Sequence, residues 1–235
     1  MAIKKVAVLG AGNGGCAAAA DLTLRGYEVR LFSRSESTLM PIAKRGGIEI
    51  VENGMEKFAA QFFVSPHLPP VVNGVDLIII AAPSVAHEYL AKALARQLAD
   101  GQRVLLNPGH TGGSPHFANM LRTFCCQAKI KLCETVTLTY ICRMPQPARV
   151  EIYRRTTNLR CAAFPGREGP ELVKEIGEIY STIIVAENVL ETGLSNINAI
   201  MHPAGMLGNA GWIEKSGGDF YYYREGITPS IAAWI

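Results

Sequence analysis

The sequence predicts an α/β fold over residues 1–187, followed over residues 188–235 by the beginning of an all-helical second domain. Three observations support this prediction. Short apolar runs alternate with helical patterns up to residue 186, as expected for a sheet covered by helices. A glycine-rich turn, GAGNGG, joins the first apolar run to the first helical pattern. Beyond residue 187 the strand patterns stop and helical spacing replaces them.

The first forty residues predict a nucleotide-binding unit. Residues 3–9 (IKKVAVL) have a β-branched and apolar centre, which is typical of a strand. The turn that follows places Gly10, Gly12 and Gly15 in the order G-x-G-x-x-G, and an Ala-rich helix leads to a second strand at 27–32. Strand, glycine turn, helix and strand within about thirty residues form the context of a Rossmann-type dinucleotide site.

Each glycine of the turn has an expected role. Gly10 permits the tight turn, Gly12 lets backbone N–H groups approach a pyrophosphate, and Gly15 allows close helix–strand packing. The N-terminus of the following helix adds a favourable dipole for phosphates. We expect Asn13, on the same turn, to belong to the cofactor site.

The end of the second strand indicates which dinucleotide is bound. NAD-binding units usually place Asp or Glu there, whereas this chain has Ser33, Arg34 and Ser35, with Glu36 too far along. A guanidinium flanked by hydroxyls would bind a 2′-phosphate through charge-assisted hydrogen bonds. We therefore expect NADP(H) to be favoured over NAD(H). The alternatives are a solvated surface arginine, or an arginine stacked on the adenine of NAD.

The next segments continue the sheet. Residues 74–82 form a continuous apolar run typical of a buried strand, and 102–107 predict another. Between them we expect a helix over roughly 84–99, with Ser84 as its cap. Pro83, at the carboxyl end of a strand, is a candidate cofactor contact because ligands bind at that edge of an open α/β sheet.

The loop at 107–113, NPGHTGG, also follows a strand and is a candidate for holding the nicotinamide ribose and part of the substrate. Gly109 is its substrate-binding candidate, and His110 is interpreted as a loop residue rather than a catalyst. The alternative is a plain strand–helix turn, since such turns are often rich in Gly and Pro.

A strand-like, Thr-rich segment at 131–143 places Glu134 and Thr135 where another carboxyl end would lie. Arg143 could hold a substrate carboxylate with its planar guanidinium, or it could be a surface arginine. Thr135 and Arg143 are therefore substrate-binding candidates. Three further strands, at roughly 149–155, 158–163 and 181–186, are expected to finish the sheet. A helix is expected at 166–180, between the last two of these strands.

The segment LSNINAIMHP at 194–203 carries the best candidate for proton transfer. At helical spacing Ser195, Asn198 and His202 fall at i, i+3 and i+7, so they would share one face. Pro203 would make the helix kink or restart at the histidine. The alternative is a core or capping histidine bonded to Asn198.

Taken in order, the glycine fingerprint, NPGHTGG, ETVTLTYICR, LSNINAIMHP and EGITPSIA resemble the octopine/nopaline (opine) dehydrogenase family. The resemblance covers essentially the whole chain. It implies reductive condensation, in which an amino acid and a 2-oxo acid such as pyruvate form an imine that NAD(P)H reduces. It also implies that His202 is the general acid/base, that Asn198 lies near the reacting centre and that the three fingerprint glycines hold the pyrophosphate.

Two departures from the family are visible. Some members of the family have an acidic residue after the second strand, whereas this chain has Ser33 and Arg34 there. In addition, Thr228 and Pro229 begin a helix with few residues left before Ile235, and no aspartate matches the family's partner for the histidine. We therefore expect a fragment whose exposed face over 188–235 is unusually apolar.

Composition excludes several classes of protein. A net charge of +3 without a dense basic patch argues against nucleic-acid binding, and the apolar run at 76–86 is too short and broken to cross a membrane. The cysteines lack metal-ligand spacing, which predicts reduced thiols in a cytoplasmic protein without a disulfide or a metal site. The expected partners are therefore small molecules, with a homodimer possible.

Two other functions stay open. A reductase similar to glycerol-3-phosphate dehydrogenase or ketopantoate reductase would share the two-domain plan but use a catalytic lysine, and neither Lys174 nor Lys215 is well placed in the pattern. A dinucleotide-binding sensor without turnover is the alternative of another class.

Overall fold

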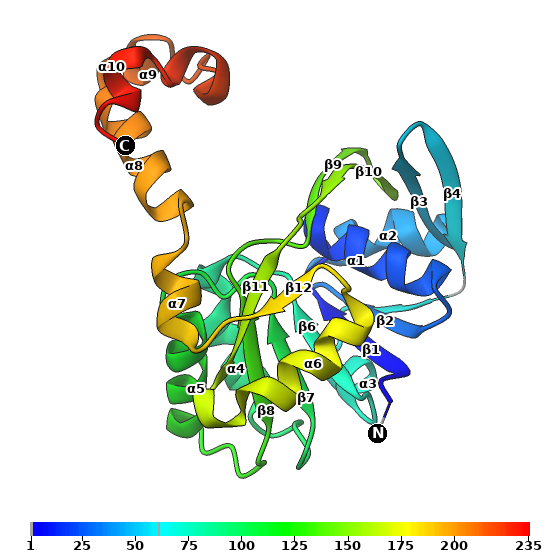
Figure 1. Ribbon diagram of the computed structural model, residues 1–235. Coiled ribbons are helices and arrows are strands. Elements are labelled where there is room, and N and C mark those ends of the chain that lie inside the picture. Colours follow the sequence, from blue (N-terminus) through cyan, green and yellow to red (C-terminus); the bar gives the residue numbers. More distant parts are fainter. Residues whose placement is uncertain (1, 61) are drawn as a thin grey trace. The chain divides into compact units, whose positions relative to one another are not determined.

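The computed structural model describes residues 2–60 and 62–235, and its contacts divide the chain into two units, Met1–Gly193 and Leu194–Ile235. The first unit is built on a large mixed sheet with helices on both faces (Figure 1). Eight strands form this sheet in the order β12-β11-β8-β7-β6-β1-β2-β5. In chain order they are β1 (Lys5–Leu9), β2 (Glu28–Phe32), β5 (Phe63–Ser65), β6 (Leu77–Ile80), β7 (Arg103–Leu106), β8 (Lys131–Thr135), β11 (Leu159–Phe164) and β12 (Ile183–Val185).

The sheet is parallel except where β11 runs antiparallel to β8. Two apolar clusters lie on its two faces. One includes residues of helices α1 and α6, and the other includes residues of α3, α4 and α5. The helical segments of this unit are α1 (Asn13–Leu24), α2 (Glu36–Arg45), α3 (Leu68–Val72), η1 (Ser84–Ala86), α4 (His87–Leu94), α5 (Gly113–Thr123), η2 (Gly166–Glu168), α6 (Gly169–Ile179) and α7 (Val189–Leu194). The expected Rossmann-type arrangement is confirmed.

A second sheet of four strands was not expected. Its order is β4-β3-β10-β9, formed by β3 (Gly47–Glu52), β4 (Met55–Ala60), β9 (Tyr140–Gln146) and β10 (Arg149–Arg155). Two predictions were therefore wrong. Residues 131–143 do not form one strand, because β8 and β9 belong to different sheets, and 149–155 does not finish the main sheet. The Thr-rich composition of 131–143 is strand-like throughout, so periodicity alone gave no signal for the change of sheet.

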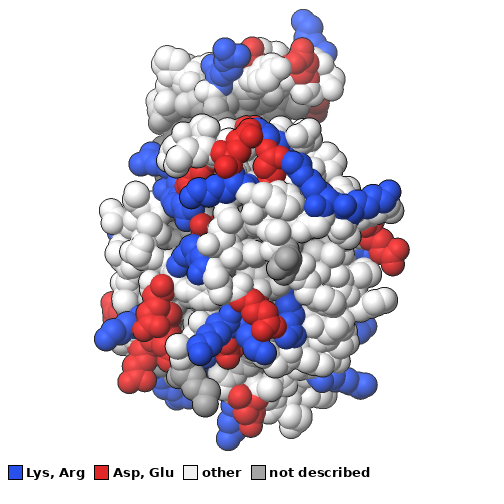
Figure 2. All heavy atoms as spheres, turned by 90° about the vertical axis from the view of Figure 1, so that its right-hand side faces the viewer, with Lys and Arg blue, Asp and Glu red and all other residues white. Residues whose placement is uncertain are grey.

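Ion pairs cover the second sheet. Arg149 pairs with Glu49, Glu56 and Glu151 across three of its strands. Lys and Arg accordingly lie beside Asp and Glu on the face drawn in Figure 2. Charge on this face is arranged in local pairs of opposite sign.

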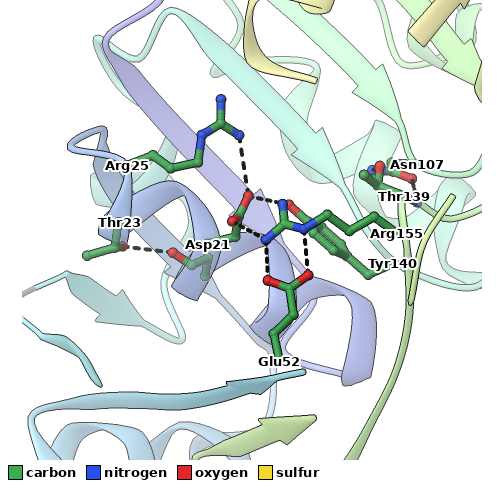
Figure 3. A network of polar contacts seen from close by, with 9 residues as sticks. Asp21, Thr23, Arg25, Glu52, Asn107, Thr139, Tyr140 and Arg155 are labelled. Carbon is green, nitrogen blue, oxygen red and sulfur yellow. Dashed lines mark hydrogen bonds and ion pairs between the residues drawn. The ribbon is translucent and has the colours of Figure 1, made fainter. Parts of the chain in front are cut away.

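A partly buried network centred on Asp21 joins the second sheet to helix α1 (Figure 3). Asp21 accepts hydrogen bonds from Arg155 Nη2 at 2.7 Å and from Tyr140 Oη at 2.8 Å, and it pairs with Arg25 at 3.3 Å. Arg155 also donates to Glu52 at 2.7 Å. Burial acts to raise the pKa of Asp21, but the hydrogen bonds from Arg155 and Tyr140 outweigh it and hold that pKa below its ordinary value. The network fixes α1 against β9 and β10.

The helix expected over 84–99 is shorter and begins differently. It consists of a 3₁₀ turn followed by α4, and the residue before α4 is Ala86, which makes no side-chain cap. The prediction that Ser84 caps this helix was wrong, because the 3₁₀ turn separates it from the first α-helical turn. Within the described residues, no helix is long and apolar enough to cross a membrane.

The second unit is helical. It contains α8 (Asn198–Gly208), α9 (Ala210–Lys215), the π-helical turn η3 (Tyr222–Gly226) and α10 (Pro229–Ala232). The predicted start of α10 is confirmed, since the side chain of Thr228 accepts from the backbone N–H of Ile231. Many large apolar side chains are exposed in Leu194–Ile235, as expected; they include Leu194, Ile197, Ile200, Leu207, Trp212 and Trp234.

The helix break predicted at Pro203 lies elsewhere. Helix α7 ends at Leu194, residues 195–197 are not helical, and α8 then runs through Pro203 without interruption. Ser195 therefore does not share a helix with His202, and that part of the prediction was wrong. A proline in a helix removes one backbone hydrogen bond, and the rest of α8 tolerates this loss.

Candidate functional site

The glycine turn has the close contacts that its sequence predicts. Gly10 has φ +118°, and a Cβ there would overlap the carbonyl oxygen of Ala81 on the neighbouring chain segment. A Cβ on Gly15 would overlap the carbonyl oxygen of Gly10. Gly12 precedes α1 as its cap residue, and a Cβ there would enter open space. The helix N-terminus behind the turn is thus accessible to a ligand.

Asn13 has a partner within the protein. Its side-chain oxygen accepts from the backbone N–H of Met144 on β9 at 2.9 Å. Leu138, which precedes β9, lies against Gly14. The segment from Leu138 to Met144 therefore packs over the start of α1, and Asn13 fixes that contact.

A cavity of about 450 Å³ lies beside the glycine turn. It contains the predicted cofactor contacts Ser33, Arg34 and Pro83, together with Gly10. Its remaining lining residues are Phe32, Ser35, Ala82, Ala86, Tyr89 and Leu90, so the described lining holds no carboxylate. The structure brings together the end of β2 and the start of the β6–α4 connection, as the carboxyl edge of a parallel sheet requires.

Arg34 lies over an aromatic ring within this cavity. Its guanidinium carbon is 4.6 Å from the ring centre of Tyr89 on α4. Ser35 caps α2 by accepting from the backbone N–H of Thr38, and its hydroxyl lies 2.7 Å from that of Ser37. Sequence reasoning missed Tyr89, although an aromatic residue six positions after Pro83, in the expected helix, could have indicated it.

The loop candidates are buried rather than accessible. Gly109 donates its N–H to the carbonyl of Thr135 at 3.0 Å, and both residues are shielded from solvent. The Thr135 hydroxyl donates to the carbonyl of Thr137 at 2.9 Å and lies 3.2 Å from the side-chain oxygen of Asn107. These residues shape the sheet edge through their mutual hydrogen bonds.

Glu134 is fully buried beneath the same loop. One carboxylate oxygen accepts from the backbone N–H of Ser114 at 2.7 Å, and the other accepts from the hydroxyl of Thr192 at 2.6 Å. Gly109 packs directly against this side chain. Sequence reasoning placed Glu134 at a carboxyl end but gave it no role, because its partners are far away in the chain.

His87 is a second buried polar group near the loop. Its ring bonds to the carbonyl of Ala82, while its Nε2 has no partner among the described residues. Burial, together with the nearby charges of His110 and His116, lowers the pKa of His87 to about 4. The imidazole is therefore neutral at pH 7.

Arg143 is exposed on β9, and its Nη1 donates to the carbonyl of Cys142 at 2.9 Å. Its neighbour Met144 bonds to Asn13, so Arg143 belongs to the segment packed over the start of α1. An exposed guanidinium with one backbone partner keeps donors free for an anion.

The proton-transfer candidate lies in the second unit. Nε2 of His202 is 2.8 Å from the hydroxyl of Tyr223, and its ring makes edge contacts with Tyr222 and Tyr223. The alternative of a histidine bonded to Asn198 is not what the structure shows. Asn198 is half-buried at the start of α8, where its N–H donates to the side chain of Asn196 at 3.2 Å. The aromatic run at 220–223 was the missed signal for the true partner.

The two units therefore carry complementary chemistry. The first has a glycine turn and a cavity suited to a dinucleotide, and the second has an imidazole held by a phenol. Imidazole can donate or accept a proton near neutral pH. In the described residues no cluster of His, Cys, Asp and Glu could hold a metal ion.

Comparisons with known proteins match two different family models to two parts of the chain. Residues 185–235 match the family model of the NAD/NADP octopine/nopaline dehydrogenase alpha-helical domain, and residues 6–107 match that of ketopantoate reductase PanE/ApbA. An opine dehydrogenase from Arthrobacter sp. (strain 1C) is 34% identical over 230 residues, 98% of this chain and 64% of the relative. A glycerol-3-phosphate dehydrogenase from Treponema pallidum (strain Nichols) is 38% identical over 90 residues, 38% of this chain and 24% of the relative.

Solved structures share the fold. Octopine dehydrogenase in complex with NADH and agmatine has a TM-score of 0.75 at 20% identity, covering 89% of this chain and 55% of its own. Yersinopine dehydrogenase with NADP+ bound has a TM-score of 0.80 at 16% identity, covering 98% and 60%. The chain thus spans 64% or less of these relatives. The likeness to octopine/nopaline (opine) dehydrogenases that the motifs predicted is confirmed.

Proposed function

We propose that this protein is an opine dehydrogenase, which condenses an amino acid with a 2-oxo acid such as pyruvate and reduces the resulting imine with NAD(P)H, or runs the reverse oxidation. The observation that carries the proposal is the 34% identity to a curated opine dehydrogenase over 98% of the chain, through both units. Solved octopine dehydrogenases, similar in fold, were determined with NADH and L-arginine or pyruvate.

The residues around the glycine turn fit a dinucleotide. Gly12 leaves the N-terminus of α1 open, and the close packing of Gly10 and Gly15 brings backbone near the expected pyrophosphate position. Asn13 would hold β9 beside the turn, and Pro83 would line the nucleotide cavity. NAD(P)H supplies the hydride when it is bound, and the protein orients the reactants and moves the proton.

For the cofactor we propose NADP(H) over NAD(H). Ser33 and Arg34 line a cavity whose described residues include no carboxylate, so no fixed negative charge there would repel a 2′-phosphate. Tyr89 would hold the Arg34 guanidinium in place through its ring face. This arrangement favours a phosphate on the ribose.

For proton transfer we propose His202, with Asn198 near the reacting centre. The Tyr223 hydroxyl would orient the imidazole, as a hydrogen-bonded partner commonly does for a catalytic histidine. Arg143 is proposed to bind a substrate carboxylate. Gly109 and Thr135 are buried, so we propose that they contribute to substrate binding by shaping the carboxyl edge of the sheet where the substrate would lie.

We further propose that the dinucleotide-binding domain comprises 1–187 and the helical domain begins at 188, between the family-model start at 185 and the contact boundary after Gly193. We propose a cytoplasmic location, which accords with the free cysteines of the described residues. The proposed partners are small molecules, as in the octopine dehydrogenase structures determined with L-arginine and with pyruvate.

The test is NADPH and NADH oxidation by the natural protein, with pyruvate alone and with a panel of L-amino acids. Oxidation that requires both pyruvate and an amino acid would support the proposal. Oxidation with an oxo acid alone would instead indicate a keto-acid reductase, a reading favoured by the ketopantoate reductase match over residues 6–107. Nucleotide binding without turnover would indicate a sensor.

A further inference from the structure

Helix α7, at the end of the first unit, is tied to the rest of that unit by a small set of polar contacts, here called the α7 anchor. It is formed by Thr111, Ser114, Glu134, Thr192 and Gly193. Thr192 donates its hydroxyl to Glu134 at 2.6 Å, and Thr111 donates its hydroxyl to the carbonyl of Gly193 at 3.0 Å. The other oxygen of Glu134 accepts from the N–H of Ser114. Helix α7 lies beside the beginning of α5 in Figure 1, in agreement with these contacts.

Glu134 is the centre of the anchor. It is fully buried, its hydrogen-bond partners are Ser114 and Thr192, and His110 is near enough to interact with it electrostatically. Its two oxygens accept from the N–H of Ser114 at the N-terminus of α5 and from the Thr192 hydroxyl. A helix N-terminus stabilises a carboxylate, and hydrogen bonds to a charged acceptor are stronger than those between neutral groups. Removing one donor would leave a buried oxygen unpaired, so the contact holds α7 firmly.

The anchor lies just before the segment that carries His202. Thr192 and Gly193 are the last residues of the first unit, three non-helical residues follow Leu194, and α8 then begins. Three extended residues span at most roughly 11 Å. The anchor therefore fixes the last residues of the first unit, and α8 begins a short distance along the chain from them.

We infer that Glu134 and Thr192 are positioning residues for proton transfer, because they fix the segment that leads to His202. This inference rests on the proposed function. The anchor also contacts the NPGHTGG loop through Thr111, so the same contacts hold the loop and α7 in one arrangement.

The experiment compares three substitutions in the natural protein. Thr192→Val removes the hydroxyl at nearly constant volume, and Thr192→Ser keeps it. Thr23→Val is the matched control, because the Thr23 hydroxyl donates only within its own helix, to the carbonyl of Ala19. The measurements are kcat and KM with NADPH, pyruvate and the best amino acid, the NADPH dissociation constant, and amide hydrogen exchange.

For Thr192→Val we expect kcat to fall at least ~tenfold and exchange over residues 189–197 to accelerate at least ~tenfold, with NADPH affinity within about twofold of the original. Thr192→Ser and Thr23→Val should stay within about twofold in every measurement. Unchanged kcat or unchanged exchange in Thr192→Val would overturn the inference, as would an equal loss in Thr192→Ser. If the original protein shows no turnover, the proposed function fails, and the exchange comparison alone decides whether Thr192 holds α7.

Discussion

Nε2 of His202 and the hydroxyl of Tyr223 lie 2.8 Å apart, although the two residues come from segments 21 positions apart in the chain. Tyr222, beside Tyr223, donates its hydroxyl to the carbonyl of Met201 at 2.6 Å and packs against Gly205. The aromatic turn therefore holds both the histidine and the helix that carries it. A histidine fixed in this way has one preferred ring orientation, which general acid/base chemistry requires.

His202→Ala should lower turnover at least ~tenfold and leave the NADPH dissociation constant nearly unchanged, because the imidazole moves a proton and lies outside the nucleotide-binding unit. Tyr223→Phe should give a smaller loss in kcat by releasing the ring. Tyr221→Phe is the control, since no side-chain hydrogen bond of the Tyr221 hydroxyl is described. Steady-state kinetics on the three variants decide the matter; unaltered turnover in His202→Ala would remove the assignment.

Arg34→Asp should shift the preference from NADPH toward NADH. The aspartate would repel a 2′-phosphate and accept from a ribose 2′-hydroxyl instead. The readout is the ratio of kcat/KM for the two cofactors, which we expect to change at least ~tenfold. Arg96→Asp, an exposed charge reversal outside the cavity lining, is the control. Equal use of both cofactors before and after the Arg34 change would refute the 2′-phosphate interpretation.

Arg143→Ala should raise the KM for the 2-oxo acid, because removal of a guanidinium clamp weakens binding of a carboxylate. We expect a change of at least ~fivefold with little change in the NADPH dissociation constant. Arg154→Ala, on the adjacent strand β10, is the control. An unchanged KM for the oxo acid would show that Arg143 does not bind the substrate carboxylate.

Most of the nucleotide-binding unit could be predicted, because its signals are local. The strand, glycine turn and helix are formed by consecutive residues, so their sequence patterns adjoin. An apolar run likewise predicts where β2 ends. The second sheet could not be predicted in the same way. Strand β3 pairs with β10, whose residues follow about a hundred positions later, and no local pattern reports such a pairing.

The candidate site divides along the same line. Gly10, Arg34 and His202 stand in short motifs and were found from residue type and spacing. Tyr89 and Tyr223 were missed, because each becomes a neighbour only through folding. The helix break before α8 was also placed too late, since Pro203 is the stronger local signal even though α8 accommodates it.

Asp21→Asn should destabilise the protein by about 1–3 kcal/mol. The change removes the charge of a buried carboxylate that accepts from Arg155 and Tyr140, while Arg155, itself partly exposed, keeps its pair with Glu52. Urea denaturation measures the free energy of unfolding. Glu28→Gln, which removes the exposed partner of Lys5 and Arg30, is the control and should change it by less than about 1 kcal/mol. Similar losses in both variants would contradict the assigned importance of the network.

His87 should make the protein less stable in mild acid. Its pKa is lowered to about 4 by burial and by neighbouring histidines, whereas an unfolded histidine titrates near 6.5. Between these values the unfolded chain binds the extra proton and the folded chain does not, so stability falls as the pH decreases from 6.5 toward 4. Complete passage through this window corresponds to about 3 kcal/mol.

His87→Gln tests this pH dependence, because an amide can still donate to the carbonyl of Ala82 but does not titrate. Free energies of unfolding from urea denaturation at pH 7 and pH 4.5 should differ by about 2–3 kcal/mol less in His87→Gln than in the original protein. The same substitution at the exposed residue His67 is the control and should keep the original difference. An equal difference in the free energy of unfolding between pH 7 and pH 4.5 in the original protein and in His87→Gln would contradict this prediction. It would mean that His87 binds a proton as readily in the folded chain as in the unfolded chain.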